Sequence, residues 1–206
     1  GLSLRNIGLT VFENNKKLYT DFGELLFTHF GVSGPLILSA SAHMRYFDKK
    51  QYRLEIDLKP ALDEQQLDKR LLSDFGKYAN HDFQNALDDL LPQKLIPVVV
   101  QLSEIPGRQK VHDLTREQRQ SLLRVLKHFP VEISAPCPVE DAIVTSGGVK
   151  VSEIDPKSME SKLVKELHFA GELIDTDAYT GGFNLQIAWA TGRLAGQSAA
   201  CERNNR

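Results

Sequence analysis

The spacing of apolar residues changes period twice along this 206-residue chain, and this limits the folds that the chain can adopt. Apolar side chains alternate with polar ones over residues 51–58, as in a half-buried β-strand, and again at Val131 and Ile133. Between these stretches, over residues 61–128, apolar side chains recur every three or four positions, as in amphipathic helices. The sequence therefore predicts a helical segment that interrupts a β-rich one.

The first thirty residues also predict β-structure. Apolar side chains flank small or polar ones over residues 2–30, and Asn14-Asn15 predicts a turn between two runs. A third run, at residues 24–28, follows Gly23. We therefore expect short strands separated by turns in this region.

A glycine- and proline-containing stretch ends the first β pattern. Pro35 suits the first turn of a helix, and Ser33 or Gly34 suits its cap. We therefore expect a short helix over residues 36–43.

The helical segment contains several separate helices. An apolar stripe covers residues 63–78, and residues 83–91 predict a second helix. Residues 92–100 fit either a kinked helix or a strand, because a proline interrupts a valine-rich run. Thr115 and Gln118 have the spacing of a capping box, which predicts the start of another helix.

Composition excludes several classes of protein. The net charge is −2, and residues 61–128 hold ten acidic and ten basic residues, so no nucleic-acid partner is predicted. No apolar run approaches the roughly 18–20 residues that span a bilayer, and the first residues do not resemble a signal peptide. We therefore expect a cytoplasmic protein with no membrane partner. The chain lacks an initiating Met, which indicates a piece of a longer protein.

A metal site is not predicted. Cys137 and Cys201 are 64 positions apart, and the six histidines include no pair at helical i, i+4 spacing. The two cysteines are expected to be structural or idle thiols of a cytosolic protein.

After the helical segment, short apolar runs predict a return to β-structure. Ala142 to Thr145 is apolar and ends at Gly147-Gly148, and Leu167 to Ala170 predicts another short strand. A long helix is expected at the end of the chain.

Glycines and one acid in this last part predict a cofactor site. Glycines let backbone approach a flat ring, and a carboxylate accepts hydrogen bonds from sugar-like hydroxyls. The N-terminus of a helix offers unpaired N–H groups and a positive dipole end to an electron-rich oxygen. The residues with this chemistry are Gly171, Glu172, Gly181, Gly182, Phe183, Asn184 and Leu185.

Simpler interpretations of these residues stay open. Glu172 could be a solvated charge at a strand end, and the Thr180 side chain could cap the final helix. Ala188, Gly192 and Gly196 give that helix a small face, which also suits tight packing.

Three blocks of the sequence resemble the HI0933-like flavoproteins, also described as bacterial NAD(P)/FAD-dependent oxidoreductases that include aminoacetone oxidase. The first block is Gly23 to Pro35. The second is Ala142 to Val149 with Asp155 to Lys162, and the third is Phe169 to Gly192. Blocks of this length are specific, and the resemblance extends over essentially the whole chain.

This resemblance implies an α+β fold, in which a β-barrel-like subdomain contains an inserted helical subdomain. The C-terminal part of a Rossmann-like FAD-binding domain would follow. The implied boundaries are 1–60 and 129–137 for the β-rich part, 61–128 for the helical part and 138–206 for the FAD-binding part. By similarity, Gly171 and Glu172 would hold the ribityl region, and Gly181 to Leu185 would face the pyrimidine end of the flavin.

The family's G-x-G-x-x-G motif, which cradles the ADP part of FAD, is absent from this sequence. We therefore expect a fragment of an FAD-dependent oxidoreductase, with or without linkage to NAD(P)H. Alone it would be inactive and would bind FAD weakly or not at all. The expected partners are the missing N-terminal FAD-binding half and a small-molecule substrate, with a homo-oligomer as a further alternative.

The sequence does not identify a catalytic residue. His29 and Thr145 are candidates only because they lie in the motif blocks, and Thr145 to Gly148 fits either a hairpin turn or a loop against the flavin ring.

Two other functions stay open. The inserted subdomains could recognise RNA, as in flavoproteins that modify tRNA, or the chain could be a scaffold or lid without a ligand.

Overall fold

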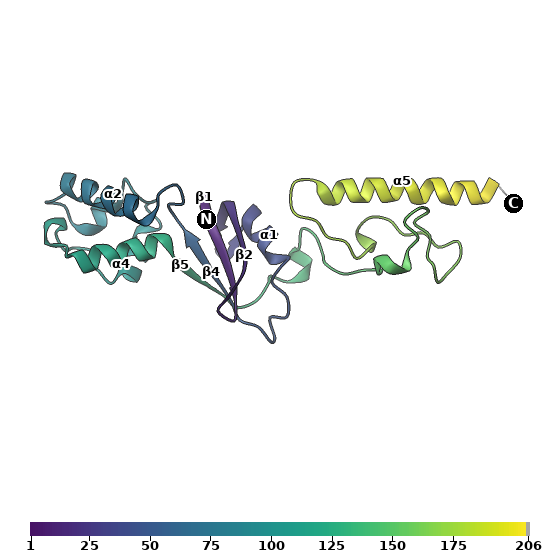
Figure 1. The fold of residues 1–206 in the computed structure, drawn as a ribbon, viewed down its shortest axis with the longest axis horizontal. Helices are drawn as coiled ribbons and strands as arrows, with labels where there is room; N and C mark the ends of the chain where they lie inside the picture. The colour runs from purple at the N-terminus through teal and green to yellow at the C-terminus, as the bar shows by residue number, and fades with distance from the viewer. Residues whose placement is uncertain (205–206) are drawn as a thin grey trace. The chain divides into compact units, whose positions relative to one another are not determined.

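The computed structural model describes residues 1–204, and its contacts divide the chain into two units. The first unit is Gly1–Ser134, and the second begins at Ala135. The first unit contains one antiparallel sheet and several helices, and the second contains one long helix and irregular segments (Figure 1). The fold class is therefore α+β, as predicted.

The sheet begins with a long hairpin of β1 (Leu2–Glu13) and β2 (Lys16–Phe27). Asn14 and Asn15 connect the strands, with φ angles of 47° and 66°. Two successive positive φ angles are typical of the tight turn that matches strand twist, and asparagine tolerates them well. The predicted turn is confirmed.

The expectation of a separate third strand at residues 24–28 was wrong. Gly23 lies inside β2 and is paired with Ile7 of β1, so the chain continues straight through it. The side chain of Leu36 packs at 3.3 Å from the position of a Cβ at Gly23, so the glycine serves close packing rather than a turn.

Three further strands complete the sheet in the order β3-β2-β1-β4-β5. They are β3 (Val32–Ser33), β4 (Tyr52–Asp57) and β5 (Phe129–Ile133). In β4 the side chains of Tyr52, Leu54 and Ile56 are buried while the alternate ones are half-exposed, which confirms the predicted one-sided strand.

The sheet curls into a half-barrel. The rings of Phe27 in β2 and Phe129 in β5 lie 6.4 Å apart, although β1 and β4 stand between those strands. In a flat sheet the same positions would be at least about 14 Å apart, which is three times the usual spacing of neighbouring strands. Irregularities in β1 between Leu4 and Ile7 and between Val11 and Phe12 add local bends of the kind that close barrels.

Helix α1 (Pro35–Ser41) covers β2 and buries Leu36, Ile37 and Ala40. Its proline occupies the first turn and Gly34 is its N-cap residue, as the sequence indicates. The helix ends two residues earlier than expected.

The helical segment lies between β4 and β5. It comprises α2 (Glu64–Lys77), α3 (Ile96–Ser103) and α4 (Arg116–Lys127), with short 3-10 turns at Phe83–Leu87 and Val111–Asp113. Figure 1 shows α2 and α4 side by side, and their buried faces share one core with the sheet. The expected helix over 83–91 is only a 3-10 turn.

Local sequence explains where these helices begin. Asp63 and Thr115 each form a complete capping box with the glutamine three residues later, which confirms the prediction made for Thr115. Of the ambiguous residues 92–100, those from 96 onward form the start of α3. Pro97 fits there because it lies in the first turn, where a missing N–H breaks no helical hydrogen bond.

The second unit is organised around α5 (Phe183–Asn204), with 3-10 turns at Val139–Asp141, Val151–Glu153 and Gly171–Leu173. The strands expected at 142–145 and 167–170 were wrong. The described part of this unit offers them no neighbouring strand, and only isolated bridges such as Val149↔Ile174 and Glu160↔His168 form. The buried cluster here is correspondingly small, comprising Ile154, Met159, Ile174 and Ala195.

Over the described residues, no helix has both the length and the apolar character that crossing a membrane requires.

Gly34 is the position where the first unit depends most on glycine. Its φ is +96°, and an added Cβ would lie 3.1 Å from the Leu26 backbone nitrogen and 3.2 Å from the Glu24 carbonyl oxygen. We expect Gly34→Ala to lower the free energy of unfolding by about 1–3 kcal/mol. Alanine disfavours this positive φ, and a backbone shift that relieved the strain would not also remove the close contacts of the new methyl group.

The matched control is Gly76→Ala, at an exposed site in α2 where an added Cβ meets nothing within 4 Å. This change should raise the free energy of unfolding by up to about 1 kcal/mol, through helix propensity. Chemical denaturation measures both variants. Equal stabilities of the two variants would contradict this account of Gly34.

Candidate functional site

Gly171 brings a loop directly onto helix α5. Its φ is +66°, and its backbone N–H donates a hydrogen bond of 2.9 Å to Thr191 Oγ1. A Cβ at Gly171 would lie 3.6 Å from the Ala188 Cβ. The small residues at 171 and 188 therefore let the loop approach the helix, while Gly192 and Gly196 meet no neighbouring atoms within 4 Å of an added Cβ.

Glu172 follows with its side chain directed to solvent. In the part of the chain that the structure describes, its carboxylate makes no hydrogen bond or ion pair. The two oxygen atoms are therefore free acceptors, which is the chemistry that recognition of a hydroxyl-rich group needs. A solvated surface charge would look the same, so geometry alone does not separate the two interpretations.

Two glycines lead into α5. The φ angles of Gly181 and Gly182 are 115° and 88°, values that L-residues with side chains rarely adopt. An added Cβ at Gly182 would meet nothing within 4 Å, so backbone conformation rather than crowding requires glycine there. The Gly182 carbonyl accepts a hydrogen bond of 3.0 Å from the Gln186 N–H, which begins the helix.

The first turn of α5 leaves backbone donors unused. Among the described residues, the N–H groups of Phe183, Asn184 and Leu185 have no acceptor, as expected at a helix N-terminus. The alternative that Thr180 caps this helix is not supported, because its hydroxyl makes no hydrogen bond within the described chain.

Asn184 has a positioning role in this structure. Its Oδ1 accepts a hydrogen bond from the Ala178 N–H, and its Nδ2 donates to the Ala178 carbonyl, both at 2.8 Å. The amide thus clamps the preceding loop to the first turn of the helix. Both polar atoms of the side chain are bonded to backbone, so we assign its contribution to a site to the backbone that it holds.

A glycine-rich loop is joined to the Gly171-Glu172 segment. Val149 N–H donates to the Leu173 carbonyl at 2.8 Å, and Asp175 N–H donates to the Val149 carbonyl at 2.9 Å. A Cβ at Gly148 would lie only 2.5 Å from the Leu173 carbonyl oxygen. The second and third motif blocks therefore meet here through a parallel bridge, and the loop is not a simple hairpin turn.

Large apolar side chains around these segments remain uncovered. Leu173 is 66% exposed, and three residues near the start of α5 are similarly exposed: Phe183, Leu185 and Trp189, at 60%, 58% and 68%. Exposed side chains of this size gathered on one short stretch are typical of a surface that contacts another molecule or chain.

The two candidate catalytic residues lie in different units. Thr145 is exposed in the second unit. His29 is at the tip of the β2–β3 hairpin in the first unit, where its ring meets Phe30 edge-on at 5.0 Å. Thr28 fixes that tip through hydrogen bonds with the backbone of Phe30 and Gly31.

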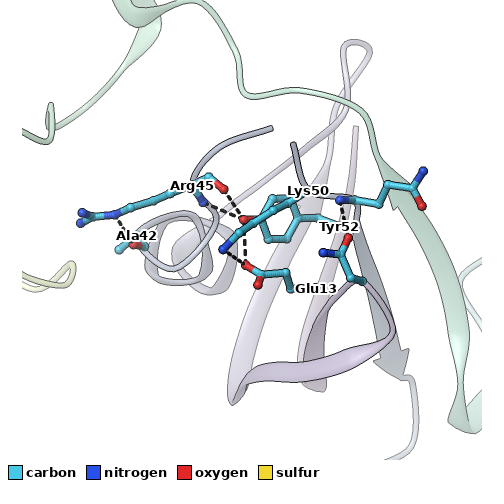
Figure 2. Close-up of polar contacts among 7 residues, drawn as sticks. Glu13, Ala42, Arg45, Lys50 and Tyr52 are labelled. Atoms are coloured by element: carbon cyan, nitrogen blue, oxygen red, sulfur yellow. Dashed lines mark hydrogen bonds and ion pairs between the residues drawn. The ribbon is translucent and has the colours of Figure 1, made fainter. Parts of the chain in front are cut away.

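Sequence reasoning missed a polar cluster at the other end of the sheet. Figure 2 shows the Tyr52 hydroxyl facing Arg45 and Glu13. It accepts from the Arg45 N–H at 3.0 Å and contacts both the Arg45 carbonyl and Glu13 Oε2, while Lys50 Nζ lies 2.9 Å from the same carboxylate. The only signal in the sequence was a tyrosine at a buried position of an alternating strand.

Electrostatics support a structural role for this cluster. The hydrogen bond from Lys50 lowers the pKa of Glu13, and the same contact raises the pKa of Lys50, so both groups stay charged. Burial raises the pKa of Tyr52, which keeps the phenol neutral. Every polar atom named here has a partner, so the cluster fastens the Ala42–Lys50 loop to the sheet.

Across the described residues, no group of three or more histidine, cysteine or acidic side chains could hold a metal ion. Cys137 and Cys201 are both exposed and free.

The first unit is a curled antiparallel sheet with a helical segment inserted between β4 and β5. Residues 1–144 match the HI0933-like protein barrel and H2TH domain. The chain therefore belongs to the HI0933-like family.

Curated relatives extend the similarity through the second unit. The chain is 33% identical to the 3-dehydro-bile acid delta(4,6)-reductase of Clostridium scindens over 89% of its own length and 45% of that protein. It is 29% identical to the ribosomal RNA dihydrouridine synthases of Escherichia coli and Haemophilus influenzae, over 95% and 82% of its length. The chain spans less than half the length of each of these relatives.

Asn184→Ala tests the clamp at the start of α5. Removing the amide leaves the Ala178 N–H and carbonyl without partners, so the loop before the helix should open more readily, by about 1–3 kcal/mol. Hydrogen exchange at the Ala178 amide measures this. The control, Gln186→Ala, removes an exposed side chain and should leave that exchange rate unchanged. Equal rates in both variants would contradict the clamp.

Tyr52→Phe tests the polar cluster. The ring still fills its buried site, but the Arg45 backbone loses its partner, so the free energy of unfolding should fall by about 1–3 kcal/mol in chemical denaturation. Tyr46→Phe removes a hydroxyl from a ring that is 62% exposed and should be neutral. A neutral Tyr52→Phe would show that the hydroxyl does not hold the loop.

Proposed function

We propose that this chain is the insert region and C-terminal cofactor-contacting segment of an FAD-dependent reductase. Under this proposal residues 1–60 and 129–137 form the β-rich insert, and residues 61–128 form its helical part. Residues 138–206 belong to a Rossmann-like FAD-binding domain, whose N-terminal half comes from elsewhere in a longer protein. The coverage of less than half of each relative supports this proposal.

The observation that carries the proposal is the packing of the Gly171-Glu172 loop on α5, where the Gly171 N–H is bonded to Thr191 Oγ1 and Gly171 lies against Ala188. Glu172 supplies a free carboxylate, Gly182 leaves open space, and the first turn of α5 supplies unpaired N–H groups. These groups fit a ligand that carries both hydroxyls and an electron-rich ring edge.

In the proposed assembly, Glu172 would accept hydrogen bonds from the ribityl hydroxyls. The backbone N–H groups of residues 183–185 would face the pyrimidine edge, where their dipole favours negative charge. Asn184 would keep those donors in place by holding the loop before them. The flavin, when bound, supplies hydride chemistry, and the protein's share is to orient and hold it.

The names of the relatives suggest the reaction class. A delta(4,6)-reductase and a dihydrouridine synthase are both named for adding hydrogen across a carbon–carbon double bond. We therefore propose reduction of a conjugated double bond in a small molecule, with or without NAD(P)H as the source of electrons. The catalytic residue of this chain is not assigned.

A ribosomal RNA substrate is a second candidate, favoured by the names of two relatives. The charges of the helical segment argue against a broad basic surface, since Arg70, Lys110 and Arg119 are each paired with an aspartate. RNA binding that weakens steeply with added salt would favour this candidate over the small molecule.

The test is a visible absorption spectrum of the longer protein and of this 206-residue chain, each with added FAD. We expect a bound-flavin spectrum only in the longer protein. There, Glu172→Gln should weaken FAD binding about tenfold or more, because a charged acceptor is lost. Glu140→Gln, at another exposed acid in the second unit, is the control. Absence of flavin from both proteins would contradict an oxidoreductase and favour an interaction module.

A further inference from the structure

A crevice opens in the first unit where the sheet meets the helical segment. Its volume is about 190 Å³, and its lining comes from the start of β1, from the two residues after β4 and from the segment before α3. Seven of the ten lining residues are leucine, isoleucine or proline, and the polar ones are Ser3, Arg5 and Lys59. The lining therefore joins an apolar wall to two cations and includes no acidic residue.

An irregularity in β1 places Arg5 at this crevice. The pairing register with β2 shifts between Leu4 and Ile7, and Asn6 has a φ of +54°. Arg5 therefore lies outside the regular ladder, as residues at β-bulges do, and bulges commonly redirect side chains beside sites. The Glu24 carboxylate lies 3.8 Å from the Arg5 guanidinium and accepts a hydrogen bond from Ser3 Oγ. The Arg5 side chain is 81% exposed and that of Glu24 is half-exposed, so this ion pair is weak.

Lys59 is a half-buried cation with no opposite charge. Within the described residues its ammonium makes no hydrogen bond or ion pair. The carboxylate of Asp57, two residues away, is held by Lys127 at 2.6 Å. Burial, and secondarily the positive charge of Arg70, lower the pKa of Lys59. A desolvated, unpaired charge lowers the stability of a fold, so this lysine is better suited to an incoming anion than to the core.

The size and wall of the crevice restrict the ligand. Its volume equals the share of about six water molecules in the liquid, which suits an anionic head with a short chain. A bare phosphate would leave the apolar wall unused. We propose that this crevice binds a small aliphatic carboxylate, with Lys59 and Arg5 at the carboxylate and the leucine-rich wall around the chain. The site is independent of the proposed flavin contacts, which belong to the second unit.

The test is an NMR titration of the 206-residue chain with hexanoate, followed through the backbone amides of Arg5 and Lys59. We expect saturable shifts with a Kd in the millimolar range. Hexanamide has the same shape without the charge and should bind at least tenfold more weakly, as should acetate, which lacks the chain. Equal affinities for hexanoate and hexanamide would overturn the role of the cations.

Variants separate the site from general effects on folding. Lys59→Met keeps the aliphatic stem and removes the charge, so hexanoate should bind at least tenfold more weakly. The control, Lys69→Met, changes an exposed lysine of α2 and should bind like the parent. Arg5→Gln, at a side chain that is 81% exposed, weakens binding without a change in the core and covers the case in which Lys59→Met does not fold.

Thermal unfolding adds a readout independent of the ligand. Because the pKa of folded Lys59 is lowered, its charged form disfavours the folded state, so Lys59→Met should raise Tm at neutral pH. This gain in Tm should shrink as pH rises through the lowered pKa toward 10.5, the ordinary lysine value.

Two outcomes of the ligand titrations would contradict the proposal. Inorganic phosphate or a short RNA that binds more tightly than hexanoate, and that needs Lys59 to do so, would overturn the assignment of a carboxylate ligand. Absence of binding by every probe would overturn the site.

Discussion

The pairing of β4 with β5 is the constraint on which the first unit depends. These strands are adjacent and antiparallel, yet the whole helical segment lies between them in sequence. Two contacts reinforce the return of the chain beside the ladder. Leu58 N–H donates to the Leu126 carbonyl at 2.9 Å, and Lys127 Nζ lies 2.6 Å from Asp57. The sheet and the helices consequently share one core, with Leu54, Leu67 and Leu126 fully buried in it.

The second unit differs from the first in how few of its apolar side chains are buried. Among its described residues, the buried cluster comprises Ile154, Met159, Ile174 and Ala195, while Trp189, Phe183 and Leu173 remain largely in solvent. Its glycines hold backbone conformations with positive φ: Gly171 lies in a loop that packs on α5, and Gly181 and Gly182 lead into that helix. These segments carry the groups that we propose for flavin contact. The chemistry of the proposed site is thus built mainly from backbone geometry, and side chains such as Asn184 act on that backbone.

Sequence alone was sufficient where a local rule determines the structure. The capping box at Thr115, the Asn14-Asn15 turn and the alternation in β4 each follow from neighbours within a few residues, and the structure confirms them. Predictions were wrong where a partner strand decides the outcome, as at 142–145 and 167–170. The Tyr52 cluster, and the crevice at Lys59, depend on residues far apart in sequence that no short pattern reveals. The flavin contacts of Gly171, Glu172 and Gly181 to Leu185 stay predictions.

The return of the helical segment to its starting edge has a consequence for how such proteins can vary. The end of β4 and the start of β5 lie side by side in the sheet. The helical segment between them therefore starts and ends at the same place, so its length does not affect the pairing of the strands. The entropy of closing such a segment grows only slowly with its length, by about 0.6 kcal/mol per doubling. The helical segment can therefore be replaced, lengthened or shortened in evolution while the half-barrel keeps its strand order.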